Sequence, residues 1–142
     1  MSTSKDYLSQ AFTIDRLLKA RRSQILELEE RRLAIGSMVI SDDKVQTSVD
    51  ASKFNHLSDL YIDLIAEYTA NEQRLLELKR EISDVIDALR NPVHRLIMFE
   101  RYVNLKRWER IAADNNYSYD YLVNTLHRKA LREVKNMLEH VG

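Results

Sequence analysis

A long run of mostly apolar residues at alternating steps of three and four dominates the middle of the chain. The run begins at Phe54, ends at Leu89 and continues for ten steps without a slip. A heptad pattern of this kind predicts one long helix with a single apolar seam, as in coiled coils. The seam consists of Phe54, Leu57, Tyr61, Leu64, Tyr68, Asn71, Leu75, Leu78, Ile82, Val85 and Leu89.

The first part of the chain predicts a partner for this helix. Residues 5–35 contain no helix breaker, and their apolar positions form a second seam, which Arg21 and Arg32 interrupt. We expect this helix to end at Gly36 and a long loop to occupy residues 36–52. Two helices of similar length joined by such a loop predict an antiparallel coiled-coil hairpin, about 45 Å long at 1.5 Å per residue.

The second helix carries more apolar residues than one partner helix can cover. Leu60, Ile62, Ile65, Leu76 and Ile86 flank its seam, and a stripe of this width predicts a further surface buried against a second subunit. We therefore expect a homodimer held by this half of the chain. Its oligomerisation residues would be Leu64, Tyr68, Asn71, Leu75, Leu78 and Ile82. Asn71 either forms a register-setting polar pair across the dimer or marks a partly open seam.

A different pattern occupies the last third of the chain. Asn91 and Pro92 stop the long helix and place the proline in the first turn of the next one, where its missing amide costs nothing. This break sets the expected boundary between the hairpin, residues 1–90, and a C-terminal domain, residues 91–142. The apolar positions of that domain predict three helices around a small core, with Trp108 as its aromatic anchor.

Within the C-terminal domain, the spacing predicts a helix-turn-helix. Small Ala112 allows a second helix to cross closely, and residues 114–117 suit a turn in which Asn116 adopts the left-handed conformation in place of glycine. Ser118 then caps a second helix. That helix is expected to bury Val123, Leu126, Ala130 and Val134. It is long enough to lie in the major groove of DNA.

The outward face of this second helix supplies candidate contacts to DNA. With Val123 facing inward, a step of 100° per residue turns another set of side chains toward solvent. Asn124 and Thr125 are expected to reach base edges, and the basic residues of the face to meet phosphates. The candidate DNA-binding residues are Ser118, Tyr121, Asn124, Thr125, Arg128, Lys129 and Arg132. The alternative is an ordinary solvated helix face, since exposed Arg and Lys are common.

Charge and composition narrow the function further. The 142 residues carry no net charge, but residues 91–142 hold nine Lys and Arg against six Asp and Glu, which favours a phosphate-facing surface in that domain. Glycine occurs twice, proline once and cysteine never, a composition typical of long helices in an all-α protein. No stretch approaches the length of a membrane span and no leader is recognisable, so we expect a cytoplasmic protein without a membrane partner.

Catalytic and metal-binding signals are weak in this sequence. The histidines, of which we expect His127 to be a partly buried packing residue, show no pairing at metal-ligand spacing, so neither a metal nor a cofactor is expected. The carboxylates of the second helix are interleaved with Arg and Lys in the manner of a solvated helix face. The sequence has no nucleophile elbow and no phosphate-cradling glycine loop, and we do not expect an enzyme.

Several short motifs resemble region four of sigma factors. They are Arg101-Tyr102-Val103, Trp108-Glu109-x-Ile111-Ala112, Tyr117-Ser118 and Leu126-His127-x-x-Ala130-Leu131. More closely, the chain is similar to the ArpU/RinA-type late transcription regulators of phages that infect Gram-positive bacteria. This likeness extends upstream through Val45-Gln46-Thr47-Ser48 and the long heptad helix. One spacing departs from it, because five residues separate Ser118 from Val123 where sigma-like sequences usually have four.

The resemblance implies a phage or prophage regulator that binds double-stranded DNA, with activation of late genes as its expected role. RNA polymerase or another phage or host protein is the further partner that it implies. Two alternatives stay open. One is the small terminase subunit of DNA packaging, which also combines helical oligomerisation with DNA binding. The other is a protein-interaction module that binds RNA polymerase or a host factor without touching DNA.

Overall fold

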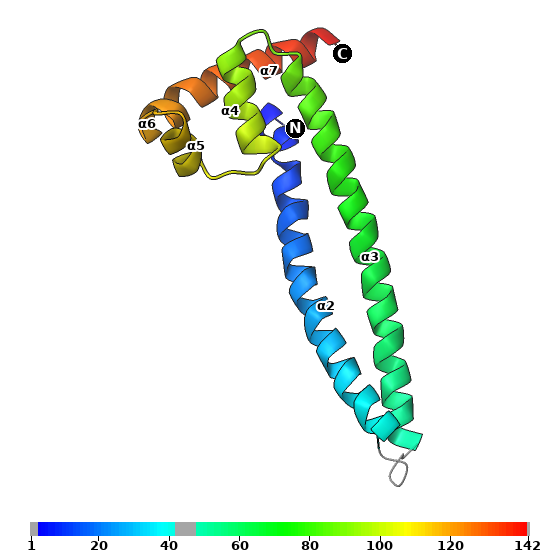
Figure 1. The fold of residues 1–142 in the computed structure, drawn as a ribbon. Coiled ribbons are helices and arrows are strands. Elements are labelled where there is room, and N and C mark those ends of the chain that lie inside the picture. The colour runs from blue at the N-terminus through cyan, green and yellow to red at the C-terminus, as the bar shows by residue number, and fades with distance from the viewer. Residues whose placement is uncertain (1–2, 42–47, 142) are drawn as a thin grey trace. The chain divides into compact units, whose positions relative to one another are not determined.

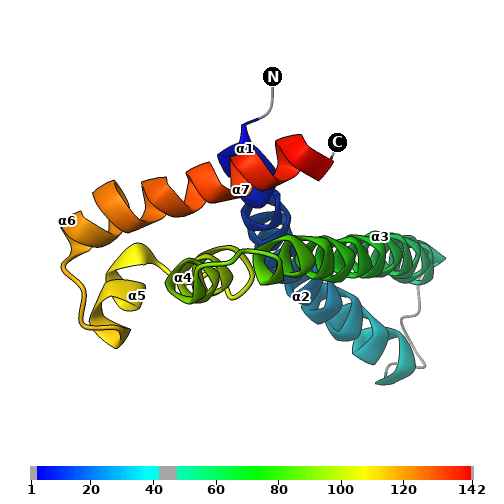
Figure 2. The same cartoon turned by 90° about the horizontal axis from the view of Figure 1, so that it is seen from above.

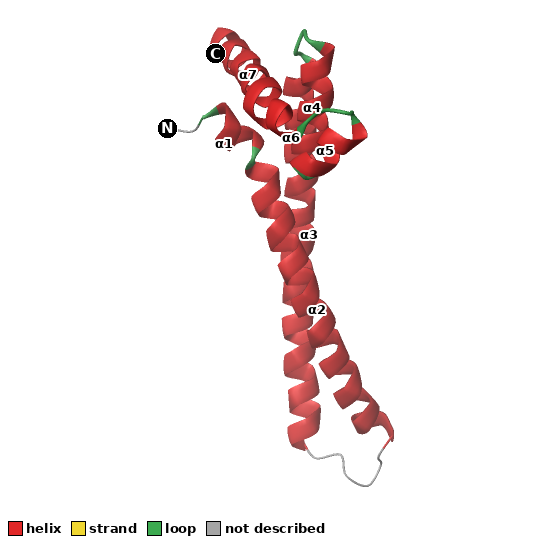
Figure 3. Cartoon of the chain, turned by 90° about the vertical axis from the view of Figure 1, so that its left-hand side faces the viewer, coloured by secondary structure: helices red, strands yellow, loops and turns green. Residues whose placement is uncertain are grey.

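The described part of the chain is entirely helical. The computed structural model describes residues 3–41 and 48–141, and these residues contain no strand (Figure 3). Their order is α1 (Ser4–Leu8), α2 (Gln10–Ser41), α3 (Ser48–Asp87), α4 (Pro92–Tyr102), α5 (Trp108–Asp114), α6 (Tyr119–Tyr121), the π-helical segment η1 (Leu122–Leu126) and α7 (His127–Val141) (Figure 1). The prediction of an all-α protein is confirmed. None of the described helices is both long enough and apolar enough to span a bilayer.

Contacts divide the chain into two units at positions that the sequence did not predict. Residues 15–74 form one unit, the hairpin unit, and residues 1–14 together with 75–142 form the other, the core unit. The expected boundary after residue 90 therefore differs from the division in the structure. The reason is that α1, the start of α2 and the end of α3 bury side chains in the core of the C-terminal helices.

The N-terminus belongs to the core unit through direct packing. Leu8 and Ala11 have no exposed surface, and α1 contacts α7, beside which it lies in Figure 2. A capping box begins α1, because Thr3 Oγ1 accepts from the Asp6 amide at 3.1 Å and the Asp6 carboxylate accepts from the Thr3 amide at 3.1 Å. The single helix expected over residues 5–35 is thus interrupted after Leu8, and α2 begins at Gln10.

The hairpin unit consists of two antiparallel helical segments. Arg21 Nη2 lies 3.7 Å from Glu67 Oε1, and the Arg32 guanidinium lies 4.8 Å from the centre of the Tyr61 ring. Positions that rise in number along α2 therefore meet positions that fall along α3, which confirms the predicted pairing (Figure 1). The two arginines that interrupt the apolar seam are half-buried, and their Nε atoms are buried without a hydrogen-bond partner in the described part of the chain.

Gly36 does not end the first helix. It lies inside α2, which continues to Ser41, and α3 begins at Ser48. The expected loop over residues 36–52 is therefore helical at both ends, and only residues 42–47 lie outside the described residues. A Cβ atom at Gly36 would lie 3.0 Å from Phe54 Cε2. Gly36 does not adopt a positive φ, so it does not form the left-handed cap that would end the helix, and its small size instead serves a close helix–helix contact.

The predicted oligomerisation residues fall into two groups. Leu75, Leu78 and Ile82 are buried within the core unit, so in this chain they are core residues and do not form an exposed face. Leu64, Tyr68 and Asn71 are half-buried in the hairpin unit. Of the flanking residues, Ile86 is fully buried, whereas Leu60, Ile62, Ile65 and Leu76 are exposed.

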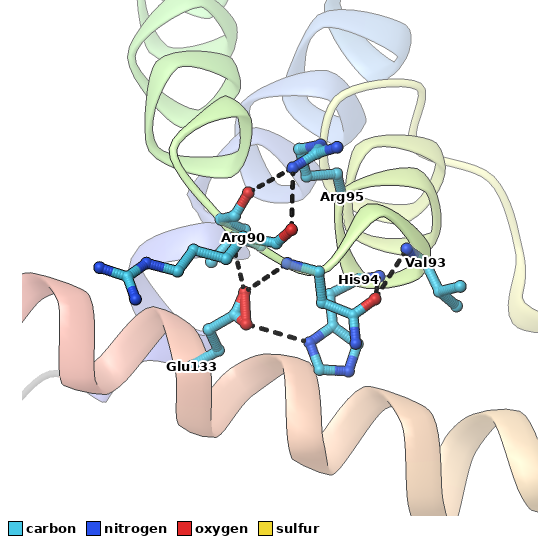
Figure 4. A network of polar contacts seen from close by, with 7 residues as sticks. Arg90, Val93, His94, Arg95 and Glu133 are labelled. Atoms are coloured by element: carbon cyan, nitrogen blue, oxygen red, sulfur yellow. Dashed lines mark hydrogen bonds and ion pairs between the residues drawn. The ribbon is translucent and has the colours of Figure 1, made fainter.

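A polar network fixes α7 against the junction of α3 and α4 (Figure 4). Glu133 of α7 accepts from the backbone amides of Arg90 at 3.1 Å and Asn91 at 3.4 Å, and its other oxygen lies 3.4 Å from His94 Nδ1. Arg95 Nη1 donates to the carbonyl oxygens of Leu89 at 2.6 Å and Arg90 at 3.2 Å. Charged side chains thus form hydrogen bonds with the backbone on both sides of the break between α3 and α4. These bonds hold α7 in a defined position.

Candidate nucleic-acid interface

The turn of the predicted helix-turn-helix has the backbone that its sequence requires. Asn116 adopts a φ of 58°, so the expected left-handed residue is present. The Tyr117 amide donates to the Ala112 carbonyl at 2.9 Å, and the Asn116 amide donates to the Ala113 carbonyl at 3.5 Å. These two bonds form a Schellman motif at the end of α5, with asparagine in the position that glycine usually takes.

The second helix begins as predicted but buries a different residue in its first turn. The Ser118 Oγ atom accepts from the Tyr121 amide at 3.1 Å, which confirms the expected cap. Leu122 has no exposed surface, whereas Val123 is half-buried. The prediction that Val123 faces the core is therefore wrong, and the buried residue follows Ser118 at a distance of four residues.

The π-helical segment η1 accounts for this shift. A π-helical turn is wider than an α-helical one, so side chains four residues apart stay on the same face through η1 and into α7. The buried side chains of this face are Leu122, Leu126, Ala130 and Val134. The last three agree with the prediction from the apolar spacing.

An aromatic cluster anchors the start of α7. His127 is buried, its Nε2 atom lies 2.5 Å from the Tyr102 hydroxyl, and its ring centre lies 4.3 Å from that of Trp108. Burial, together with the nearby charges of Lys5 and Arg101, lowers the pKa of His127 to about 4. Burial also raises the pKa of Tyr102 to about 12. At neutral pH the imidazole is therefore uncharged and the hydroxyl protonated, and the two groups share one hydrogen bond.

Trp108 takes part in this core without being its deepest residue. It is half-buried, whereas Tyr102 is almost fully buried. The Arg101 guanidinium lies 5.0 Å from the Trp108 ring centre and 4.4 Å from that of Phe12, so one cation joins the N-terminal segment to α5 through two aromatic faces. The sequence motifs contain Arg101, Tyr102 and Trp108, but no spacing signal connected them with Phe12.

The candidate DNA-binding residues lie on or beside one exposed face. Arg128, Lys129 and Arg132 are exposed, and none of them pairs with a carboxylate in the part of the chain that the structure describes. Tyr121 is also exposed, Thr125 is half-buried, and the hydroxyl of Ser118 is engaged in the cap. The acid of α7 that lies nearest in sequence to these bases, Glu133, is engaged at the α3–α4 junction.

One polar pair on the same helix was not predicted. Asn124 is exposed, and its Nδ2 atom donates to Asp120 Oδ1 at 2.5 Å. The spacing of four residues that permits this bond is present in the sequence. The predicted site consisted of basic and neutral polar residues and did not include Asp120. Asp120 is therefore an additional member of the candidate interface.

The described residues contain no group of three or more His, Asp or Glu side chains that would suit a metal ion. Comparisons with protein-family models, curated proteins and solved structures found no match to this chain. A function can therefore be inferred from the geometry of the helix-turn-helix and from the charges of its exposed face.

Proposed function

We propose that this protein binds double-stranded DNA through the helix-turn-helix of α5 to α7. The observation that carries the proposal is the set of three exposed cations on the helix that follows the capped turn, Arg128, Lys129 and Arg132, which form no ion pair with the described residues. In helix-turn-helix proteins this helix lies in the major groove. Cations on its exposed face would then neutralise phosphates and release counterions, while neighbouring polar side chains meet base edges.

Regulation of transcription in a bacterial cytoplasm, with activation of phage or prophage late genes, is the role that the sequence resemblance supports. A site of one helix and a few cations binds weakly on its own, because each phosphate contact contributes modestly and is lost as salt rises. Such a regulator therefore depends on a second copy or on a protein partner such as RNA polymerase. A second copy and a protein partner would each give a complex whose stoichiometry can be measured.

The test of DNA binding is the salt dependence of affinity. Fluorescence anisotropy with a labelled duplex gives the slope of the logarithm of the binding constant against the logarithm of the salt concentration. Arg128→Ala and Arg132→Ala should each weaken binding to every sequence and reduce that slope by about one unit. Arg22→Ala is the matched control, because Arg22 is exposed on α2 in the hairpin unit. Unchanged affinity and slope in both interface variants, with intact circular dichroism, would reject the proposed face.

We also propose a homodimer formed through the hairpin unit. Leu26 and Leu33 on α2 are each 53% exposed, and Ile62 on α3 is 63% exposed, so this unit presents large apolar side chains that one chain leaves uncovered. Sedimentation velocity at micromolar concentration should give a dimer, and Leu26→Glu with Leu33→Glu should shift it to a monomer. A wild-type monomer would contradict the dimer, and a closed ring of more subunits would instead favour the small terminase subunit.

A further inference from the structure

Asp120 and Asn124 form an oriented polar pair at the start of the recognition helix. Both side chains are exposed, and Asn124 Nδ2 donates to Asp120 Oδ1 at 2.5 Å. A carboxylate ion accepts hydrogen bonds and cannot donate them. The amide of Asn124 can therefore point only its nitrogen toward Asp120, and its carbonyl oxygen is directed elsewhere.

We infer that Asn124 reads an adenine in the major groove and that Asp120 positions its amide for that contact. This inference rests on the DNA binding proposed above. An asparagine amide has two N–H donors and one carbonyl acceptor. When Asp120 takes the N–H that lies trans to the carbonyl oxygen, the other N–H and that oxygen remain together on one edge of the amide.

The free edge of the amide matches adenine better than the other bases. Adenine presents N7 as an acceptor beside its N6 amino group as a donor, so one N–H and one carbonyl oxygen satisfy both. Guanine presents two acceptors, N7 and O6, in the corresponding positions, and the carbonyl oxygen of Asn124 would face one of them. Cytosine offers a donor and thymine an acceptor with a methyl group, so neither gives the amide a bidentate partner.

The charge of Asp120 also needs an explanation, which positioning supplies. A carboxylate on a helix that approaches phosphates lowers affinity by repulsion, especially beside the cations of the same face. The alternative role for Asp120 is to stabilise the first turn of the helix, where negative charge is favourable. The two roles differ in their readout, because loss of helix stabilisation would weaken binding to every sequence, whereas loss of positioning would change the preferred base.

The experiment selects bound sequences from a library of duplexes randomised at the centre and measures total affinity for the unselected library. The wild type should enrich adenine at one position, and Asn124→Ala should reduce that enrichment by roughly 5- to 100-fold. Asp120→Ala should reduce the adenine enrichment and raise total affinity. Asp120→Asn should raise total affinity and keep only part of the enrichment, since its amide oxygen can still accept from Asn124 but its amide nitrogen can also donate to the Asn124 oxygen.

The control for charge alone is Glu139→Ala, because Glu139 is an exposed acid near the other end of α7. It should leave the preferred base unchanged at every position. Adenine enrichment retained in Asp120→Ala would overturn the positioning role, and enrichment retained in Asn124→Ala would overturn the reading of adenine. Arg128→Ala should weaken binding to the library without changing the base profile of the residual complexes, and this result would support the proposed function whatever the outcome at Asn124. Failure of the adenine inference and failure of the proposed function are therefore distinguishable.

Discussion

The core unit and the hairpin unit contain parts of the same two helices and the same heptad pattern, but they bury that pattern to different depths. In the core unit the α3 seam residues Leu78 and Ile82 are buried, whereas in the hairpin unit Leu57 and Leu64 are only half-buried. Heptad spacing determines which side chains face the neighbouring helix. The depth of burial depends on how many further elements cover that contact, and in the core unit α1, α4 and α7 add to it.

Packing in the hairpin unit is correspondingly less complete. A surface pocket of about 300 Å³, open to solvent, lies beside its seam, with Leu28, Leu60 and Leu64 among the lining residues. The half-buried Arg21 and Arg32 replace apolar residues at seam positions. We therefore expect the core unit to lose more stability on truncation of a side chain, and the hairpin unit to be improved by removing polar groups from its seam.

The largest expected effect comes from comparing the same substitution, leucine to alanine, in the two units. Leu8→Ala should lower the free energy of unfolding of the core unit by about 2–5 kcal/mol, because Leu8 is fully buried and its removal leaves a cavity. Leu17→Ala removes the same atoms from an exposed site in the hairpin unit, outside the residues named for the dimer, and should change stability by less than about 0.5 kcal/mol. The fluorescence of Trp108, the single tryptophan, reports unfolding of the core unit in urea. Similar losses for both variants would show that the N-terminus is not part of that core.

The role of Leu8 also shows where sequence reasoning reaches its limit. The apolar spacing correctly predicted helices on both sides of the hairpin and their antiparallel pairing. It assigned Ala11 to that pairing and left Leu8 out of the seam, since a period of three and four is the same whether a helix meets one neighbour or several. Docking of α1 on α7 joins residues far apart in the chain, and no local pattern records such a contact.

The second prediction concerns the pH dependence of the core unit. The folded state holds the pKa of His127 at about 4, below its usual value of 6.5, so the unfolded state binds more protons between these values. Stability is complete above pH 6.5 and falls as the pH decreases toward 4, by up to about 2 kcal/mol at pH 5. His127→Gln keeps an acceptor for Tyr102 and removes this titration. Urea unfolding followed by Trp108 fluorescence should show a smaller loss of stability on acidification in the variant than in the wild type, and identical profiles would contradict the prediction.

The turn was more predictable than the helix that follows it. Asn116 and Ser118 act through their own backbone and side chain, so residue type and position were sufficient to predict a left-handed turn and a helix cap. The identity of the first buried residue depended on η1, where the helical period changes. The apolar spacing of a regular α-helix selected Val123 as the inward-facing residue, where the structure buries Leu122. The cations of the face were nevertheless found, because they lie beyond the irregular turn.

A smaller effect is expected from the polar seam of the hairpin unit. Arg32→Met should stabilise this unit by about 1 kcal/mol, because a buried nitrogen without a partner costs about 1–3 kcal/mol, more than an exposed cation–π contact contributes. The contact that is lost is the one with the Tyr61 ring. Arg22→Met is the matched control, because Arg22 is an exposed arginine ten residues earlier on the same helix. Hydrogen exchange of residues 15–41 should slow in the first variant alone, and faster exchange would show that the cation stabilises the seam.

The smallest expected effect tests why glycine lies inside α2. In an open helix, Gly36→Ala would stabilise by about 1 kcal/mol through helix propensity. Here the new Cβ would lie 3.0 Å from Phe54 Cε2, so the ring must move, and we expect the gain to be largely offset. In a Phe54→Ala background the ring is absent, and the same substitution should recover its full stabilisation. Hydrogen exchange in the hairpin unit gives the free energies of the wild type, the two single variants and the double variant. The coupling term of this double-mutant cycle measures the contact between position 36 and Phe54. Equal effects of Gly36→Ala in both backgrounds would mean that close approach to Phe54 does not explain the glycine.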